Sequence, residues 1–302
     1  MKRRHFLYYS LLFVTSCGVA QQTGSLESGE SRETGKEPKK LRFAVTDVLD
    51  SEKLQRDYGE FRTALAEVLE VEVEFVPVSN MLAAVSALTL DQLDIALAGP
   101  SEYVVIHART QAVPLIAVTR PNYRSAIAVP KDSPIQSTAD LKGKVLALSD
   151  VGSTSGHLGP TKLLIDAGLD PKVDVEIRML GDEGSVAALK EGTADAWGGS
   201  IVDYEKFIKT DDGQFPIVAQ GPMLPSDVLI ASSQLDPAFV DAMRSRLVEN
   251  QTKLIGALVL GESTKKYKGS KLVPANDADY DMVRQVYQAL GEGDLIPQQS
   301  LQ

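Results

Sequence analysis

Histidine, cysteine and tryptophan are scarce in this sequence. Its 302 residues contain three histidines (His5, His107 and His157), one cysteine, Cys17, and one tryptophan. So few histidines exclude a His-rich metal cluster, and the sequence lacks a Walker loop, a dinucleotide-binding fingerprint and a G-x-S-x-G elbow. Ser155 and His157 are two residues apart at a predicted helix start and point in different directions. We therefore expect no metal, no cofactor and no catalysis.

Long apolar runs and excess positive charge are also missing. No apolar run beyond the first twenty residues reaches the roughly 18 to 20 residues that span a bilayer, and aromatics make up only 6% of the chain. The 31 Lys and Arg residues face 41 Asp and Glu residues, which disfavours a nucleic-acid partner. A hydrophobic content of 43% is enough for one large domain or two ordinary ones.

The first 17 residues have the pattern of a signal peptide. Lys2, Arg3 and Arg4 precede a short apolar stretch over residues 6–14. Residues 14–17 (VTSC) resemble the lipobox of bacterial lipoproteins, which implies lipidation of Cys17 and anchoring to a bacterial membrane, in the periplasm or on the cell surface; a lone buried thiol is the alternative. Arg3 and Arg4 fit twin-arginine export, and the general route remains open.

Residues 18–40 are poor in large apolar side chains and rich in Gly, Ser, Glu and Lys, the composition of a flexible tether. The folded part is expected from Leu41. Strand patterns at 41–46, 71–76, 94–98, 115–118, 126–129, 145–148, 175–179, 194–197 and 217–219 alternate with helical patterns such as 61–69 and 82–93. This alternation predicts an α/β fold with mainly parallel sheets flanked by helices.

One segment divides the chain. Residues 126–134 (AIAVPKDSP) followed by 140–144 (DLKGK) resemble the crossover into the second lobe of type II periplasmic binding proteins, with a return near 216–227. The resemblance implies lobe 1 over 41–125 plus 225–302, lobe 2 over 126–224, and hinges near Ala126 and 216–227. Ligands of open α/β sheets bind beyond the carboxyl ends of the strands, so we expect the ligand cleft at the hinge between the lobes.

The strongest candidate site follows the strand at 145–148. Ser153, Thr154 and Ser155 lie between Gly152 and Gly156 where a helix is expected to begin. Unpaired amides and the dipole at a helix start attract anions, and flanking glycines permit close approach of the backbone. The simpler alternative is that Ser153 or Ser155 only caps the helix.

Residues 150–160 (DVGSTSGHLGP) resemble the DxGSTSGxLxP signature of the phosphonate- and phosphite-binding (PhnD-like) receptors of ABC importers. The resemblance, over about 41–227, implies a monomeric receptor that serves a membrane permease, with Ser153, Thr154 and Ser155 holding the phosphorus-bound oxygens. His157 is carried over as an oxygen donor, against the alternative of a structural histidine. Without residues 1–16 the chain loses three cations and no acid, so its formal charge is −13 and anion binding must depend on local amides and hydroxyls.

Residues 94–103 (DIALAGPSEY) resemble the segment with which the family closes the site from the other lobe. Some members have an aromatic residue where this chain has Ala98, so Ser101 and Tyr103 become the candidates. At residues 79–81 this chain has SNM, where members of the family can have a Tyr. The smaller aromatic wall favours a compact ligand such as phosphite, methylphosphonate or phosphate.

A carboxylate can accept the proton of a monoprotonated oxyanion and repel the dianion. Asp203 is the predicted acceptor, and Asp182 and Asp227 are weaker candidates whose alternative is solvation or helix capping. Tyr123 and Tyr204 can line the cleft or belong to the core. Other solutes, such as a sulfonate or a thiamine-precursor-like compound, remain alternatives, as do a ligand-sensing domain of a signalling system and a purely structural lipoprotein.

Overall fold

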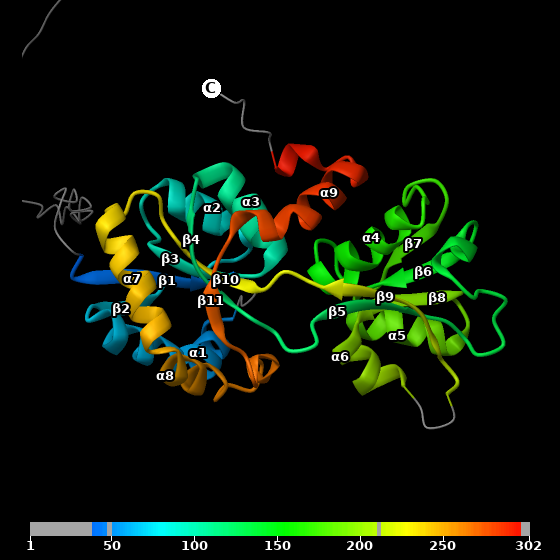
Figure 1. The fold of residues 1–302 in the computed structure, drawn as a ribbon, viewed down its shortest axis with the longest axis horizontal. Helices are drawn as coiled ribbons and strands as arrows, with labels where there is room; N and C mark the ends of the chain where they lie inside the picture. The colour runs from blue at the N-terminus through cyan, green and yellow to red at the C-terminus, as the bar shows by residue number, and fades with distance from the viewer. Residues whose placement is uncertain (1–37, 47–49, 210–212, 297–302) are drawn as a thin grey trace, which may run out of the picture. The chain divides into compact units, whose positions relative to one another are not determined.

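The computed structural model describes residues 38–46, 50–209 and 213–296. The predicted signal peptide with Cys17, and the predicted tether up to residue 37, lie outside this part of the chain. Figure 1 shows the described elements as two sheets, each flanked by helices. In the part of the chain that is described, no helix has the length and apolarity needed to cross a membrane.

The first sheet has six strands in the order β11-β4-β10-β3-β1-β2. They are β1 (Lys40–Val45), β2 (Glu72–Phe75), β3 (Ile95–Ala98), β4 (Val113–Val118), β10 (Asp227–Ala231) and β11 (Leu272–Pro274). β1 pairs in parallel with β2 and β3, whereas β10 is antiparallel to β3 and β4, and β11 is antiparallel to β4. The sequence reading missed β10 and β11.

The second sheet has five strands in the order β7-β6-β8-β5-β9. They are β5 (Arg124–Ala128), β6 (Val145–Leu148), β7 (Glu176–Met179), β8 (Ala196–Ser200) and β9 (Ile217–Met223). β6 is parallel to β7 and β8, and β5 is antiparallel to β8 and β9. Both sheets are therefore mixed, with β10 and β11 reversed in the first and β5 reversed in the second. The predicted α/β fold of mainly parallel sheets flanked by helices is confirmed, and the reversed strands are what the sequence patterns did not indicate.

The antiparallel pairs of β5 and β10 have a common cause in the path of the chain. It leaves the first sheet after β4, enters the second at β5, and returns from β9 to β10. Two segments, 119–123 and 224–226, make these crossovers, and the amide of Leu224 donates to the carbonyl of Tyr123 at 2.8 Å. The crossovers therefore lie side by side. The strand that follows each crossover, β5 or β10, pairs with neighbours that run in the opposite direction. The sequence patterns of separate βα units do not reveal this pairing.

Helices cover both faces of the sheets (Figure 1). The longer ones are α1 (Ser51–Leu69), α2 (Met81–Thr89), α3 (Pro100–Thr110), α4 (Gly159–Asp166), α5 (Gly181–Glu191), α7 (Pro237–Glu249), α8 (Gln251–Leu258) and α9 (Asp281–Leu290). α1 begins because the Asp50 carboxylate accepts from the amides of Glu52 and Lys53, as an N-cap residue does. Its apolar stripe, including Leu54, Phe61 and Leu65, is buried against the first sheet.

The C-terminal helix α9 links regions distant in sequence. It packs against α3 and also against α4 and the short helix η2 (Thr154–Leu158). Val283, Val286 and Tyr287 lie on its buried face, and Tyr280, just before it, donates to the carbonyl of Ser226 at 3.0 Å. This helix is therefore placed to contact the predicted binding loop.

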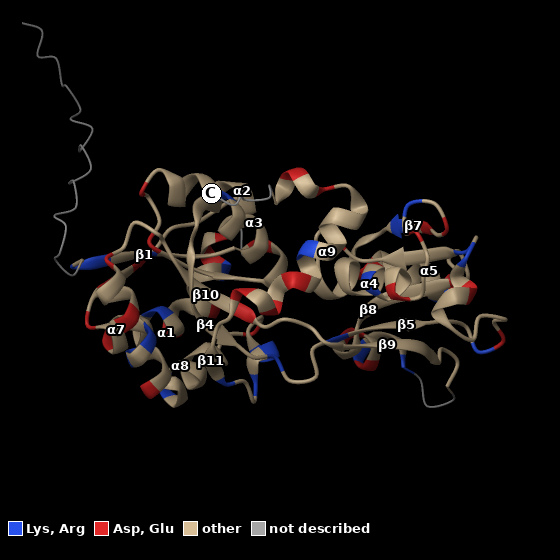
Figure 2. Cartoon of the chain, turned by 45° about the horizontal axis from the view of Figure 1, so that its top comes forward, with Lys and Arg blue, Asp and Glu red and all other residues tan. Residues whose placement is uncertain are grey.

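Charged residues of both signs are interspersed over the described helices and loops (Figure 2). Ion pairs such as Lys162–Asp166 on α4 and Arg284–Asp281 on α9 join neighbouring turns. Such exposed pairs add little stability. An anionic ligand must therefore be held by local donors rather than drawn in by a basic surface.

Candidate ligand-binding site

The loop from Ser149 to Leu158, after β6, forms the centre of the candidate site. Gly152 has a φ of 84°, which a residue with a side chain adopts only with strain. The Ser153 hydroxyl accepts from the amide of Gly156 at 3.1 Å, so Ser153 caps η2 as the simpler reading expected. η2 is a π-helical turn rather than the first turn of a regular α-helix, and α4 follows it directly.

Two backbone amides of this loop are available for a ligand. Among the hydrogen bonds of the described residues, none engages the N–H groups of Thr154 and Ser155. The amide of Gly156 is already bonded to Ser153, and those of His157 and Leu158 bond to the Ser153 carbonyl. Adjacent unpaired amides form an anion-binding nest without a positively charged side chain.

Thr154 joins the loop to the other lobe. Its side chain is 5% exposed, and its hydroxyl oxygen accepts from the amide of Ser101 at 3.3 Å. Ser101 follows β3 at the start of α3, so the structure brings together two of the predicted site residues from segments 53 residues apart. Because the Thr154 oxygen accepts, its own proton remains to be donated.

Ser155 is held by the first crossover. Its carbonyl accepts from the Ser125 hydroxyl at 3.0 Å, and its side chain lies near the Tyr123 hydroxyl. Tyr123 is almost fully buried, and this burial raises the pKa of its hydroxyl. Tyr123 therefore supports the binding loop from the segment that connects the two sheets.

His157 supports the loop from within. Its Nδ1 atom accepts from the amide of Gly152 at 3.1 Å, and the ring is 5% exposed. Burial lowers the pKa of His157, because a charged imidazole would lose hydration. An Nδ1 atom that accepts must carry no proton, so the neutral ring has its proton on Nε2. The contact with Gly152 agrees with the structural reading of His157 and leaves Nε2 as a donor.

Protonation of His157 should destabilise the fold. Because the folded-state pKa lies below the ordinary value of 6.5, the unfolded chain binds the proton first as the pH falls. The free energy of unfolding should then decrease below about pH 6.5, with a slope of at most about 1.4 kcal/mol per pH unit, and level off below the folded-state pKa. Urea unfolding of wild type and His157→Gln between pH 5 and 7.5 measures this effect.

The matched control is His107→Gln. The ring of His107 is 24% exposed, and its Nδ1 atom lies 2.9 Å from the Ala112 carbonyl oxygen, to which it donates. His157→Gln should show a shallower pH dependence than wild type, and His107→Gln shows what the loss of a histidine outside the loop does to stability. Equal slopes in wild type and His157→Gln would show that His157 does not titrate in this range.

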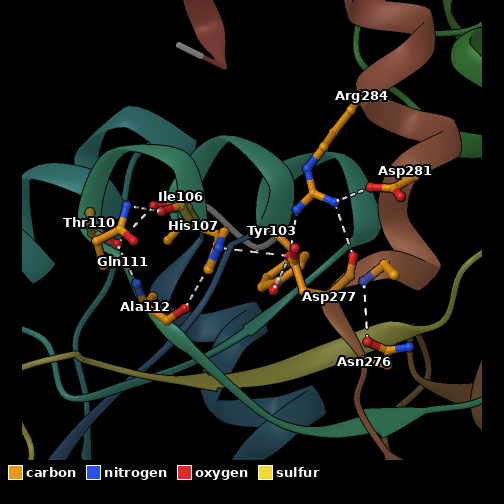
Figure 3. A network of polar contacts seen from close by, with 11 residues as sticks. Tyr103, Ile106, His107, Thr110, Gln111, Ala112, Asn276, Asp277, Asp281 and Arg284 are labelled. Atoms are coloured by element: carbon orange, nitrogen blue, oxygen red, sulfur yellow. Dashed lines mark hydrogen bonds and ion pairs between the residues drawn. The ribbon is translucent and has the colours of Figure 1, made fainter. Parts of the chain in front are cut away.

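Tyr103 belongs to a separate polar network, shown in Figure 3. Its ring is fully buried, and its hydroxyl donates to Asp277 Oδ1 at 2.7 Å. Arg284 also bonds to Asp277, and the His107 Nε2 atom lies 3.8 Å from it. Burial and the Asp277 carboxylate raise the pKa of Tyr103. The structure therefore places the Tyr103 hydroxyl in the contact between α3 and the segment leading to α9, and not with Ser153–Ser155.

The three acidic candidates are each engaged elsewhere. Asp203 forms a reciprocal cap with Ser200, whose hydroxyl donates to it at 2.5 Å and accepts from its amide at 3.0 Å. Asp182 accepts from Ser149, and buried Asp227 accepts from the Tyr267 hydroxyl at 2.5 Å. Asp182 is thus the one bonded directly to the binding loop, at its first residue. Tyr204 is buried, and its hydroxyl donates to the Phe215 carbonyl.

Sequence reasoning missed two residues at the Ser101–Thr154 contact. The Ser101 hydroxyl donates to Glu102 Oε2 at 3.0 Å, and the Tyr287 hydroxyl on α9 lies near the Ser101 side chain. A Cβ atom on Gly152 would lie 3.7 Å from the same Tyr287 oxygen. Tyr287 therefore lies between Ser101 and the binding loop. The seven-residue spacing of Tyr280 and Tyr287 on an amphipathic helix was the signal for its burial.

A groove of about 360 Å³ lies beside the loop rather than over it. Lys162 and Leu163 of α4, Met223 and Leu224 at the second crossover, and Met282 of α9 are among its lining residues, and Ser125 is shared with the Ser155 support. Its polar groups are the ion-paired Lys162 and Asp166 and the exposed Asp279. The Thr154 and Ser155 amides do not line it, so we place the site at the loop.

The loop of hydroxyls and unengaged amides, in contact with Ser101 of the first sheet's side, has donors of the kind that suit a small anion. Residues 43–280 match the family model of phosphonate periplasmic substrate-binding proteins of ABC transporters, and the chain belongs to this family. No group of His, Cys, Asp and Glu suited to a metal occurs among the described residues.

Two relatives carry descriptions that fit the family. The "Phosphate-import protein PhnD" of Mycolicibacterium smegmatis is 27% identical over 278 residues, covering 84% of this chain and 87% of the relative. The "Probable ABC transporter phosphite binding protein PhnD1" of Prochlorococcus marinus is 29% identical over 145 residues, covering 45% of this chain and 48% of the relative. The chain is thus a PhnD-like substrate-binding protein of an ABC importer.

Solved structures share the type II periplasmic binding protein fold. PhnD1 of Prochlorococcus marinus in complex with methylphosphonate has a TM-score of 0.61 at 20% identity, covering 85% of this chain and all of that one. The aliphatic sulphonate binding protein SsuA of Escherichia coli has a TM-score of 0.57 at 19% identity, covering 87% of this chain and 90% of that one. At these identities the likeness concerns the fold alone.

Proposed function

We propose that this chain captures a small phosphorus oxyanion, such as phosphite, methylphosphonate or phosphate, at the Ser153–Ser155 loop, and delivers it unchanged to a membrane permease. The observation that carries the proposal is the pair of unengaged amides at Thr154 and Ser155 directly beside Ser101 of the other lobe. The methylphosphonate complex of PhnD1, which has the same fold, supports the ligand class.

The loop can hold an oxyanion without a countercharge. The Thr154 and Ser155 amides and the Thr154 hydroxyl are donors, and a hydrogen bond to a charged group contributes roughly 1.5–3 kcal/mol when it is sheltered from water. Thr154 and Leu158 are buried in the described structure. Fixed neutral donors bind a small anion reversibly, as a transport receptor requires.

The two crossovers are the proposed hinge. They are the only connections between the two sheets within the described residues, and their hydrogen bond from Leu224 to Tyr123 keeps them together. Residues 119–123 and 224–226 would absorb the rotation of one lobe against the other. Residues 119–123 lie just before Ala126, and residues 224–226 lie within 216–227, the two regions where the sequence suggested the hinges. A smaller radius of gyration with ligand in small-angle scattering is the expected sign of closure.

Membrane anchoring is a separate part of the proposal. Residues 14–17 (VTSC) and the basic residues before them support cleavage and lipidation at Cys17, followed by a tether to about residue 37. The receptor would then act as a monomer outside the cytoplasmic membrane. Cys17→Ser should move the protein from the membrane fraction to the supernatant.

Calorimetric titration with methylphosphonate, phosphite, phosphate, 2-aminoethylphosphonate and sulfate tests the ligand class. We expect the tightest binding for one of the compact phosphorus oxyanions and weaker binding for 2-aminoethylphosphonate, whose longer side chain needs more room. Preference for sulfate, or no binding of any phosphorus compound, would contradict the proposal and favour a sulfonate-type receptor.

A further inference from the structure

Glu102 fixes which hydrogen-bonding partner the second lobe offers to the ligand. Its carboxylate accepts the Ser101 hydroxyl proton at 3.0 Å. Glu102 also folds back over the start of α3, since a Cβ atom on Gly99 would lie 2.4 Å from its Oε2 atom. An ionised carboxylate can only accept hydrogen bonds, so the direction of this bond is determined. The Ser101 proton is therefore committed to Glu102.

The remaining bonds of Ser101 leave an acceptor. Its amide donates to Thr154 Oγ1 at 3.3 Å, and the Tyr287 hydroxyl lies near its side chain. Because the Ser101 proton is committed, the phenol can meet the Ser101 oxygen only as a donor. Burial raises the pKa of Tyr287, with Glu102 and Glu292 as further causes, so the phenol keeps its proton. A hydroxyl oxygen has two lone pairs, and one is left on Ser101.

The two sides of the site then have opposite character. The amides of Thr154 and Ser155 can only donate to a ligand, and the Thr154 hydroxyl, which accepts from the Ser101 amide, keeps its proton for donation. Ser101 can only accept. A deprotonated phosphorus oxygen satisfies the first side, and a P–OH group satisfies the second. A fully ionised oxyanion would face a Ser101 lone pair with the Glu102 carboxylate behind it.

We propose that Glu102, acting through Ser101, makes the site selective for the monoprotonated form of the phosphorus oxyanion. This inference rests on the proposed function and names the ligand's protonation state. The sequence had predicted that Asp203 accepts the proton of the ligand. In this inference Ser101 accepts that proton, and Glu102 is the positioning residue that holds Ser101 as an acceptor. Among the titratable groups near Glu102 is Tyr287 from α9, on whose hydroxyl Glu292 also acts.

The test is the pH dependence of methylphosphonate affinity, measured by calorimetry between pH 6 and 8.5. The second ionisation of the ligand falls in this range, so the wild-type affinity should decrease by about tenfold or more as the dianion replaces the monoanion. Glu102→Gln lets Ser101 donate to the ligand, because the amide of Gln can donate to the Ser101 oxygen. Its profile should fall by less than about threefold over the same range.

Asp203→Asn is the matched control, since it removes the same charge from another candidate carboxylate. It should keep the wild-type profile, because Asp203 is capped by Ser200. If Glu102→Gln does not fold, as judged by thermal melting, Glu102→Ala decides instead and should show the same shallow profile, because it also removes the carboxylate that holds the Ser101 proton. Parallel profiles in wild type and the folded Glu102 variant overturn the inference. Absence of methylphosphonate binding at every pH overturns the proposed function itself.

Discussion

Replacing Thr154 with valine should weaken methylphosphonate binding by about 10- to 150-fold, or roughly 1.5–3 kcal/mol, the range of a hydrogen bond to a charged group. Valine keeps the size of threonine but removes the hydroxyl that lies against Ser101. The ligand would lose a donor, and the amide of Ser101 would lose its acceptor. Calorimetric titration of the variant and of wild type at pH 6 measures the difference.

Thr154→Ser is the matched control. It retains the hydroxyl and should bind within a few-fold of wild type. Ser155→Ala should also lose affinity, but for a different reason, because the Ser155 side chain lies near Tyr123. Equal affinities in wild type and Thr154→Val would show that the loop is only a helix cap. Thermal melting of each variant without ligand separates a binding loss from misfolding.

Gly156→Ala should have the larger effect, because it changes the shape of the loop. A Cβ atom there would lie 2.5 Å from the Cβ of Ser149, closer than two carbon atoms can approach without movement of the backbone. The loop is closed by two bonds of Gly156, from its amide to Ser153 and from the Ser149 amide to its carbonyl. We expect a loss of about 1–3 kcal/mol in stability and of more than a hundredfold in affinity, of order 3 kcal/mol.

Gly256→Ala is the control for this glycine. It lies within α8, where an added Cβ atom meets nothing within 4 Å, and alanine favours a helix over glycine by about 1 kcal/mol. This variant should melt at or above the wild-type temperature and bind normally. If Gly156→Ala bound methylphosphonate as wild type does, the loop geometry described above would not be the one that binds the ligand.

The sequence predicted most of the strands and their mainly parallel arrangement, but not which strands are reversed. Alternating and buried patterns located nine strands, among them β6 (Val145–Leu148) at its observed bounds. β10 was missed because its fully buried run, DVLIA, directly follows the crossover and lacks alternation, and β11 has only three residues. Mixed pairing depends on where the chain changes sheets, which is a property of the whole path rather than of any local pattern.

The candidate site was predicted in part. The Ser-Thr-Ser run and Ser101 were found from motifs, and the structure brings Thr154 and Ser101 into contact. Tyr103 and Asp203 were chosen by their position in a motif. In the structure Tyr103 is hydrogen-bonded to Asp277, and Asp203 is hydrogen-bonded to Ser200. Glu102 was not singled out, because an acidic residue in the first turn of a helix usually only complements the helix dipole. Its bond to Ser101 is visible only in three dimensions.

The most direct test of the account is a crystal structure of the protein with methylphosphonate. The account predicts phosphorus-bound oxygens within about 2.7–3.1 Å of the amide nitrogens of Thr154 and Ser155, with a further oxygen at Ser101. Density for the ligand in the groove lined by Lys162 and Met223, with the Thr154 and Ser155 amides unengaged, would contradict it.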